Sequence, residues 1–280
     1  MDAGKLNGSI FIDLKKAFDT VDHNILLCKL SCNGVNGNAL QLLKSCLIDR
    51  TQRSYVNGVS STEQYVPCDI PQGSILDPFL FIICVNDFPK CLQPTTPGMF
   101  ADDMYITVAH EDTSTIECCL NSDLAAVHDW LQANKLSCNT SKTSYMTIGS
   151  RQNLTKAKFM NLKMDGWPIE HKPSTKFLGV HIDEMLNWDE QIKHISSKVS
   201  NGLRMFYLAR RLTDNHETLQ KIYYSLVQPY FDYCDIVWND CSKIRADKSQ
   251  KLQNRAARII TLADYSRYSI ISSPKFSRVV

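Results

Sequence analysis

The sequence lacks any apolar run long enough to cross a membrane. Its longest uninterrupted apolar stretch is "FLFIICV", from Phe79 to Val85, whereas a membrane-spanning helix needs about 20 such residues. The N-terminal stretch "MDAGKLNGSIF" also lacks the basic segment, the apolar segment and the cleavage site of a secretory signal. These absences argue against a membrane protein and predict an intracellular one, nuclear or cytoplasmic, that is not secreted.

The cysteine and histidine spacings of redox and zinc motifs are missing as well. The chain holds 11 cysteines, but no two form a C-x-x-C motif and none pairs with a histidine at zinc-finger spacing. A disulfide framework is typical of short secreted chains. We therefore expect reduced thiols that fill small apolar spaces.

Charge is unevenly distributed, although the net charge is only +2. Residues 1–140 hold 9 of the 31 Lys and Arg residues but 16 of the 29 Asp and Glu residues. An acidic half followed by a basic half is compatible with a metal site joined to a polyanion-binding region, and also with chance. The length of 280 residues, 44% of them hydrophobic, suits one large domain or two small ones.

Strand and helix patterns alternate up to about residue 183, and helical patterns dominate afterwards. Asn57-Gly58 and Asp165-Gly166 each mark a hairpin turn, whereas "STKFLGVHID" has the pattern of one strand. These patterns predict an α+β domain followed by a small helical domain, with the boundary after residue 183. Helices are expected over residues 23–30, 39–47, 79–86 and 114–136, and in three segments after Trp188, the last over residues 250–263.

A carboxylate pair interrupts an apolar segment in the middle of the chain. In "GMFADDMYITVAH", Asp102 and Asp103 stand between two strand-forming arms with no basic residue nearby. Adjacent anions repel and Asp is a poor strand former, so the pair fits either an exposed turn or a divalent-cation site. Asp13 follows another short strand, "SIFI", and is the best third ligand. Asp19 and Asp22 lie near it, but each is equally explained as a helix cap or a surface charge.

Five stretches of sequence include or follow these carboxylates, and their order and spacing are more specific than any one of them: "FIDLKKAFDTVDHNILL", "IPQGSILDPFLF", "FADD", "NKLSCNTSKT" and "KFLGVHID". Together, over roughly residues 8–262, they resemble the reverse transcriptases of non-LTR (LINE-type, jockey-like) retrotransposons. The resemblance implies a right-hand polymerase fold of α+β class. Its palm, an antiparallel sheet with packed helices and part of the fingers, would lie within residues 1–183, a small helical thumb within 184–262 and a divergent tail within 263–280.

The resemblance also implies a catalytic role for the carboxylates. Asp13 matches the first catalytic carboxylate of the family, and Asp102 and Asp103 match its "[FY]ADD" motif, with Asp102 the more direct metal ligand. The implied cofactors are two Mg²⁺ ions, for which Mn²⁺ substitutes, and the implied reaction is nucleotidyl transfer to a primer 3′ hydroxyl. Lys142 matches a lysine close to the triphosphate that could protonate the pyrophosphate; a solvated lysine is the alternative.

Four residues match the family's contacts to the nucleotide and the template. Phe18 matches the bulky residue that would clash with a ribose 2′ hydroxyl, although a core aromatic residue is the alternative. Pro71, Gln72 and Gly73 match the loop beside the nascent base pair, where the glycine would permit close backbone approach. An ordinary turn is the alternative for that loop.

The matches further along the chain concern the primer and the duplex. Phe177, Leu178 and Gly179 resemble the primer-grip hairpin that positions the 3′ end. Five arginines would suit a thumb lying against phosphates, and a solvated helix face explains them equally well: Arg204, Arg210, Arg211, Arg255 and Arg258.

The implied partners are an RNA template, a DNA primer and deoxynucleoside triphosphates, with no membrane; the oligomeric state is left open.

The sequence departs from the family pattern in three places. Only about a dozen residues precede Asp13, so we expect a chain without the fingers segments and the endonuclease of a full-length element. Asp77 stands where the family has glycine, which adds bulk and charge near the template loop. The tail after about residue 263 loses the pattern.

These departures predict a truncated copy that is weak or inactive alone. The main alternative is a non-catalytic nucleic-acid-binding remnant that keeps palm and thumb as a scaffold. A nucleotide cyclase would share the strand-end carboxylates but leaves "PQGS" and "FLG" unexplained. A chain without a stable fold is a third alternative.

Overall fold

In a computed structural model of the chain, residues 4–70, 73–213, 215–238 and 243–261 are described. The chain divides into two compact units between Pro173 and Ser174, and each unit is described by itself. The sequence placed the boundary after residue 183. It falls earlier because Val180 is buried in the core of the second unit and the backbone N–H of His181 donates to Gln191 Oε1 at 3.0 Å.

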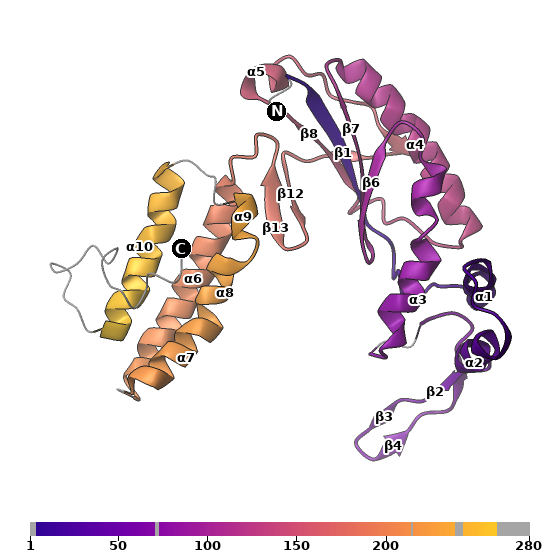
Figure 1. Cartoon of the computed structure of the whole chain (residues 1–280), viewed down its shortest axis with the longest axis horizontal. Coiled ribbons are helices and arrows are strands. Elements are labelled where there is room, and N and C mark those ends of the chain that lie inside the picture. Colours follow the sequence, from indigo (N-terminus) through magenta and orange to yellow (C-terminus); the bar gives the residue numbers. More distant parts are fainter. Residues whose placement is uncertain (1–3, 71–72, 214, 239–242, 262–280) are drawn as a thin grey trace. The chain divides into compact units, whose positions relative to one another are not determined.

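The first unit is built on a five-stranded sheet with the strand order β11-β8-β1-β7-β6. All neighbouring strands are antiparallel except β11 and β8, and Figure 1 shows β1 between β7 and β8. An antiparallel sheet with packed helices is the α+β class that the sequence predicted, which is thereby confirmed. The strands are β1 (Leu6–Ile12), β6 (Thr96–Phe100), β7 (Asp103–His110), β8 (Ser144–Ile148) and β11 (Glu170–His171).

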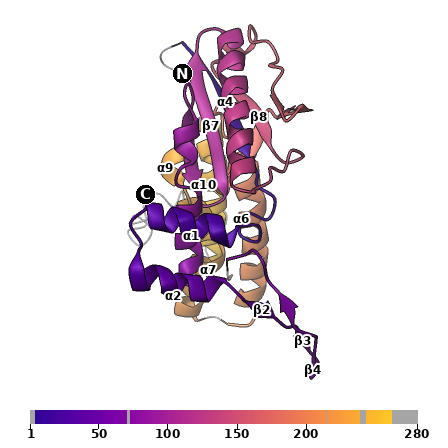
Figure 2. The same cartoon turned by 90° about the vertical axis from the view of Figure 1, so that its right-hand side faces the viewer.

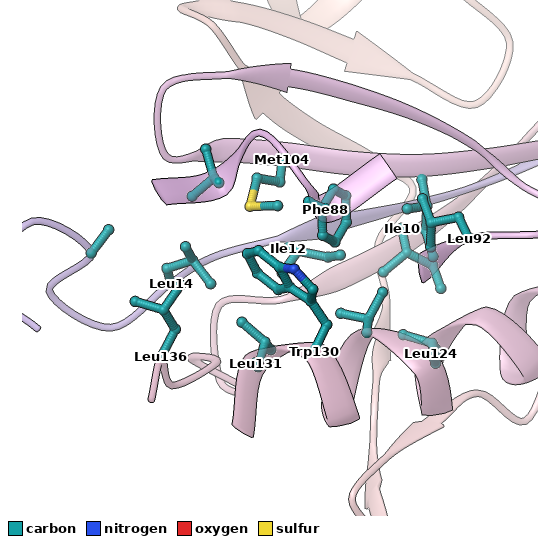
Figure 3. Packing of buried hydrophobic residues seen from close by; sticks show 14 of the residues in the cluster. Ile10, Ile12, Leu14, Phe88, Leu92, Met104, Leu124, Trp130, Leu131 and Leu136 are labelled. Atoms are coloured by element: carbon teal, nitrogen blue, oxygen red, sulfur yellow. The ribbon is translucent and has the colours of Figure 1, made fainter. Parts of the chain in front are cut away.

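Helix α4 (Thr113–Ala133) covers one face of this sheet. Its apolar residues recur at helical spacing, and four of them are fully buried: Ile116, Leu120, Leu124 and Val127. From the strands, alternate residues such as Ile10, Ile12 and Met104 point into the same core, as Figure 3 shows. Burial of these side chains is the main favourable term that fixes the positions of the strand ends.

Smaller elements surround the sheet, and Figure 2 shows α1 and α2 side by side, as their contacts require. The expected hairpin at Asn57-Gly58 is present, with both residues at positive φ (50° and 84°). The elements are α1 (His23–Cys32), α2 (Gly37–Leu47), β2 (Thr51–Gln52), β3 (Tyr55–Val56), β4 (Val59–Ser60), β5 (Gln64–Tyr65), α3 (Leu76–Val85), η1 (Phe88–Cys91), α5 (Arg151–Leu154), β9 (Lys163–Met164) and β10 (Trp167–Pro168).

A buried carboxylate anchors the start of β6. Asp123 on α4 is 1% exposed. It accepts hydrogen bonds from the backbone N–H groups of Gln93 and Thr95, at 3.2 and 3.0 Å, and from the Thr95 hydroxyl at 2.5 Å. Because each donor would otherwise be left unsatisfied, this cluster holds the segment that leads into the β6–β7 hairpin.

Gly8 allows α4 to approach β1 closely. A Cβ atom at this position would run into Ile116 Cγ2 and stand 3.0 Å from Leu120 Cδ1. We expect Gly8→Ala to lower the free energy of unfolding by about 1–3 kcal/mol, as overpacked cores do. Denaturant unfolding would measure the change. Ile116→Leu removes the clashing methyl group, so the double variant should recover part of the loss; equal losses in single and double variants would contradict this packing.

The second unit begins with the hairpin of β12 (Ser174–Phe177) and β13 (Val180–Asp183), where the sequence pattern predicted one strand. The first helical segment predicted after Trp188 is present as α6, and the apolar residues along one side of it are buried: Ile192, Ile195, Val199, Leu203 and Phe206. The helices are α6 (Asp189–Arg210), α7 (His216–Leu226), α8 (Gln228–Asp232), α9 (Asp235–Trp238) and α10 (Lys243–Thr261). The tail predicted at 263–280 lies outside the described residues. Across the described ranges, none of the helices has the length and apolar character required to span a bilayer.

Candidate active site

The carboxylate pair lies at the tip of the β6–β7 hairpin. Phe100 pairs with Asp103, so only Ala101 and Asp102 connect the two strands. Ala101 adopts a positive φ of 52°, which is uncommon for a residue other than glycine. Asp102 is exposed to solvent in this turn, so the adjacent anions Asp102 and Asp103 can be tolerated at the connection between the two strands.

Strand register brings Asp13 to the same corner of the sheet. Ile12 pairs with Met104, and one further step along both strands places Asp13 opposite Asp103. Because side chains alternate between the two faces, these two carboxylates point away from the buried Ile12 and Met104. The pairing therefore gathers carboxylates from positions about ninety residues apart in the sequence.

The electrostatics at this corner favour a cation. Burial raises the pKa of Asp103, and the neighbouring charges of Asp102 and Asp13 raise it further. Repulsion among carboxylates has this effect, and a nearby positive charge relieves it.

A pocket of about 550 Å³ opens beside these carboxylates. It combines carboxylates, which attract a metal ion, with lysines, which attract an anion, so its lining suits a complex of both. The predicted residues Asp13, Asp102, Lys142 and Phe18 are brought together here. The complete lining is Asp13, Leu14, Lys15, Lys16, Ala17, Phe18, Asp19, Asp102, Asn139 and Lys142.

Three carboxylates were expected to hold two metal ions, with Asp103 bound less directly than Asp102. Within the described ranges, no three His, Cys, Asp or Glu side chains gather closely enough to hold one metal ion. Mg²⁺ is usually bound by one or two carboxylates together with substrate phosphates. Asp13 and Asp102, which line one pocket, fit that kind of site. Asp103 is the first residue of β7 and is not part of the pocket lining.

Asn139 contributes to the site and was missed by sequence reasoning. Its side-chain amide donates to Asp13 Oδ2 at 2.9 Å, and its backbone N–H donates to the Asp13 carbonyl at 2.7 Å. The Thr143 hydroxyl accepts from the backbone N–H of Asp13 at 3.1 Å. The only available signal was the turn-forming stretch "NTS" directly before Lys142, which does not reveal a contact between residues far apart in the sequence.

Phe18 lies at the edge of the core and at the wall of the pocket. Its ring packs against the buried Phe81, with centroids 4.4 Å apart, as a core aromatic residue would. The same half-buried side chain also lines the pocket. A rigid ring at the pocket wall is suited to shaping what enters.

The predicted template loop is described only in part, because Pro71 and Gln72 lie outside the described residues. Gly73 has a φ of +86°, and a Cβ atom added there would meet nothing within 4 Å, so the backbone is open to approach. Asp77 was expected to add bulk and negative charge near this loop. The residue is 6% exposed, and its carboxylate accepts hydrogen bonds from the backbone N–H and the hydroxyl of Ser74, next to Gly73, at 3.3 and 3.0 Å. Ser74 Oγ in turn accepts from the backbone N–H of Leu76. Asp77 thus takes part in starting α3.

The predicted primer-grip residues form the β12–β13 turn in the second unit. Leu178 and Gly179 both have positive φ, 45° and 82°, and the Tyr233 hydroxyl donates to the Leu178 carbonyl at 2.6 Å. A left-handed leucine is unfavourable, so this contact helps to hold the turn. Among the predicted arginines, Arg204, Arg211 and Arg255 are exposed, whereas Arg210 donates to the Ile259 carbonyl on α10.

The first unit is thus an α+β unit with a pocket at the adjoining ends of β1, β6 and β7. The carboxylates and lysines of that pocket suit a cation and an anionic ligand. The sequence profile of the family described as "Reverse transcriptase (RNA-dependent DNA polymerase)" matches residues 2–182, and the chain belongs to this family.

Its relatives are encoded by mobile elements. The RNA-directed DNA polymerase from mobile element jockey of Drosophila funebris is 27% identical over 271 residues, which cover 92% of this chain and 29% of the relative. A probable RNA-directed DNA polymerase from transposon X-element of Drosophila melanogaster is 24% identical over 266 residues, covering 93% and 29%. The chain thus spans 29% of the length of these relatives. The prediction of a jockey-like, non-LTR reverse transcriptase is confirmed.

Among solved structures, apo telomerase from Candida tropicalis, truncated from its C-terminal domain, aligns with a TM-score of 0.46 at 14% identity. The alignment covers 64% of this chain and 34% of the telomerase chain.

Proposed function

We propose that the pocket catalyses RNA-directed DNA synthesis. The observation that carries this proposal is that Asp13 and Asp102, from two strand ends, line one pocket with three lysines. In the proposed reaction, the primer 3′ oxygen forms a bond to the α-phosphorus of a deoxynucleoside triphosphate. The bond from that phosphorus to the bridging oxygen breaks, and pyrophosphate leaves.

Asp13 and Asp102 would hold Mg²⁺, or Mn²⁺ in its place. The bound ions supply a lower pKa for the attacking hydroxyl and stabilise charge on the leaving oxygen. Asn139 orients the Asp13 carboxylate through its 2.9 Å hydrogen bond. A carboxylate held by a neighbour in this way loses less freedom when it binds an ion.

The lysines would bind the triphosphate. Lys142 lines the pocket together with Lys15 and Lys16, so three positive charges face the space where phosphates would lie. Lys142 is the proposed proton donor to the pyrophosphate. Phe18 is the proposed barrier to a ribose 2′ hydroxyl.

The remaining contacts are assigned from the family pattern. Pro71, Gln72 and Gly73 would lie by the template base, and Phe177, Leu178 and Gly179 would position the primer end. Residues 184–262 would form the thumb along the template–primer duplex. A protein acting on these partners would work inside the cell, in the nucleus or the cytoplasm.

One observation favours a second function, non-catalytic binding of nucleic acid. Lys15, Lys16 and Lys142 line the pocket, and their positive charges would attract a phosphate backbone whether or not catalysis is retained. A scaffold that had lost catalysis would bind a duplex equally well when Asp13 is neutralised.

Primer extension on an RNA template with a DNA primer tests the proposal. We expect slow extension by the purified chain that requires Mg²⁺ or Mn²⁺ and stops when the ions are chelated. Duplex binding without extension in either metal, by protein shown to be folded, would favour the second function.

A further inference from the structure

A row of basic side chains runs from the β12–β13 hairpin onto α6. Lys176 on β12 pairs directly with His181 on β13. The rings of His181 and His194, the latter on α6, lie with centroids 4.9 Å apart and planes inclined by 44°. Lys198 follows His194 by one helical turn and continues the row on the same side of α6. These four residues are called the β13–α6 basic row, and Figure 1 shows the hairpin beside α6.

The members of the row repel one another. Like charges directly opposite in a strand pair are destabilising, and Lys176 faces His181 in this way. Burial lowers the pKa of His194, and the charges of His181, Lys176 and Lys198 lower it further. The charged groups that act on His194 in the described structure come from β12, β13 and α6, and all of them are basic.

Two neighbouring acids are already engaged. The carboxylate of Asp183, at the end of β13, accepts from the backbone N–H groups of the following turn, including that of Trp188 at 2.7 Å. Glu190 pairs with Lys193 at 2.7 Å. Among the described ion pairs, none involves Lys176 or Lys198. The row therefore presents uncompensated positive charge next to two half-buried imidazoles.

We propose that the β13–α6 basic row binds a phosphodiester group of a nucleic-acid backbone and that its two histidines make this binding proton-linked. An anion placed in the row removes the mutual repulsion and accepts charge-assisted hydrogen bonds from protonated imidazoles. This inference rests on the proposed function only in taking a nucleic acid as the source of the phosphate. The β13–α6 basic row is separate from the hairpin tip at Leu178 and Gly179.

The sign of the pH effect follows from linkage. The bound anion favours the protonated imidazoles, so the histidine pKa values are higher in the complex than in the free protein. Binding then takes up protons, so affinity rises as the pH falls through the pKa values of the complex and levels off below those of the free protein. Nucleic-acid phosphates stay ionised over this range, so the change comes from the protein.

Fluorescence anisotropy with a labelled RNA–DNA duplex, at constant ionic strength, tests the proposal on the full chain. Between about pH 8 and about pH 5.5 the affinity should rise about tenfold, the range in which histidine titrates. His181→Gln combined with His194→Gln should reduce the rise to less than about twofold. His110→Gln, a matched change at the end of β7, should keep it. An unreduced rise in the double variant would overturn the proposal.

Two further measurements locate the phosphate contact on the row. Lys176→Ala and Lys198→Ala should each lower the salt dependence of binding, by about one unit of slope per lost phosphate contact. In NMR spectra the ring signals of His181 and His194 should shift with the duplex, and also with inorganic phosphate at higher concentration. A shift with inorganic phosphate alone would overturn the nucleic-acid source. Because none of these readouts needs primer extension, an inactive pocket would refute the proposed function and leave this test intact.

Discussion

Asp102→Asn should lower the rate of primer extension by at least about a thousand-fold, because it removes a negative charge from the pocket without changing its shape. Asp102 is exposed in the β6–β7 turn and lines the pocket with Asp13. Asp103 stands in the strand and outside the pocket lining, so Asp103→Asn should cost less, about tenfold. Single-turnover extension in Mg²⁺ and in Mn²⁺ would measure both variants.

Asp165→Asn is the matched control for this substitution. Asp165 also occupies a hairpin turn at positive φ, 51°, between β9 and β10, where asparagine is well tolerated. Its neutralisation should leave extension unchanged. Similar rates for the Asp102→Asn and the unmodified chain would refute a catalytic role for the pocket carboxylates.

Phe18→Val should raise the use of ribonucleotides relative to deoxynucleotides by about 10–100-fold, a typical size for relief of a steric clash in a pocket. The aromatic ring stands at the pocket wall and is held in place by Phe81 at 4.4 Å. A smaller side chain would leave room for a 2′ hydroxyl. Competing ribo- and deoxynucleotides in one extension reaction would give the ratio directly.

Phe18→Tyr is the control because it keeps the ring and its packing, and discrimination should be retained. A thermal melt of each variant separates selectivity from stability, since Phe18→Val also removes a contact with Phe81. If Phe18→Val left the ratio unchanged in a folded protein, packing in the core would be the whole role of this residue.

Local features of the fold could be predicted where one residue type carries the signal. Glycine marked the turns at Asn57-Gly58 and Asp165-Gly166, and both hairpins are present. The turn at Leu178-Gly179 was missed by the pattern because leucine at positive φ has no sequence signal. Helix α3 begins at Leu76 rather than after Pro78, since proline is tolerated in the first turn of a helix.

The charged residues of the site could be predicted from the sequence, but the residues that hydrogen-bond to them could not. Asp13 and Asp102 were predicted to lie together because each follows a short strand, and both line one pocket. The contact from Asn139 to Asp13 joins residues more than a hundred positions apart, which no local pattern encodes. The Asp77 carboxylate contacts Ser74 beside the predicted template loop, but the family pattern alone did not indicate that this contact also helps to start α3.

The connection between β6 and β7, which contains Asp102, is as short as a hairpin turn allows. Only Ala101 and Asp102 lie between the paired Phe100 and Asp103. Inserting or deleting one residue within β7 would turn Asp103 and Met104 to opposite faces, burying a carboxylate and exposing a core side chain. The spacing of residues is therefore as strict a constraint on this hairpin as the identity of Asp102, and a change of one residue in length should be as damaging as the loss of that carboxylate.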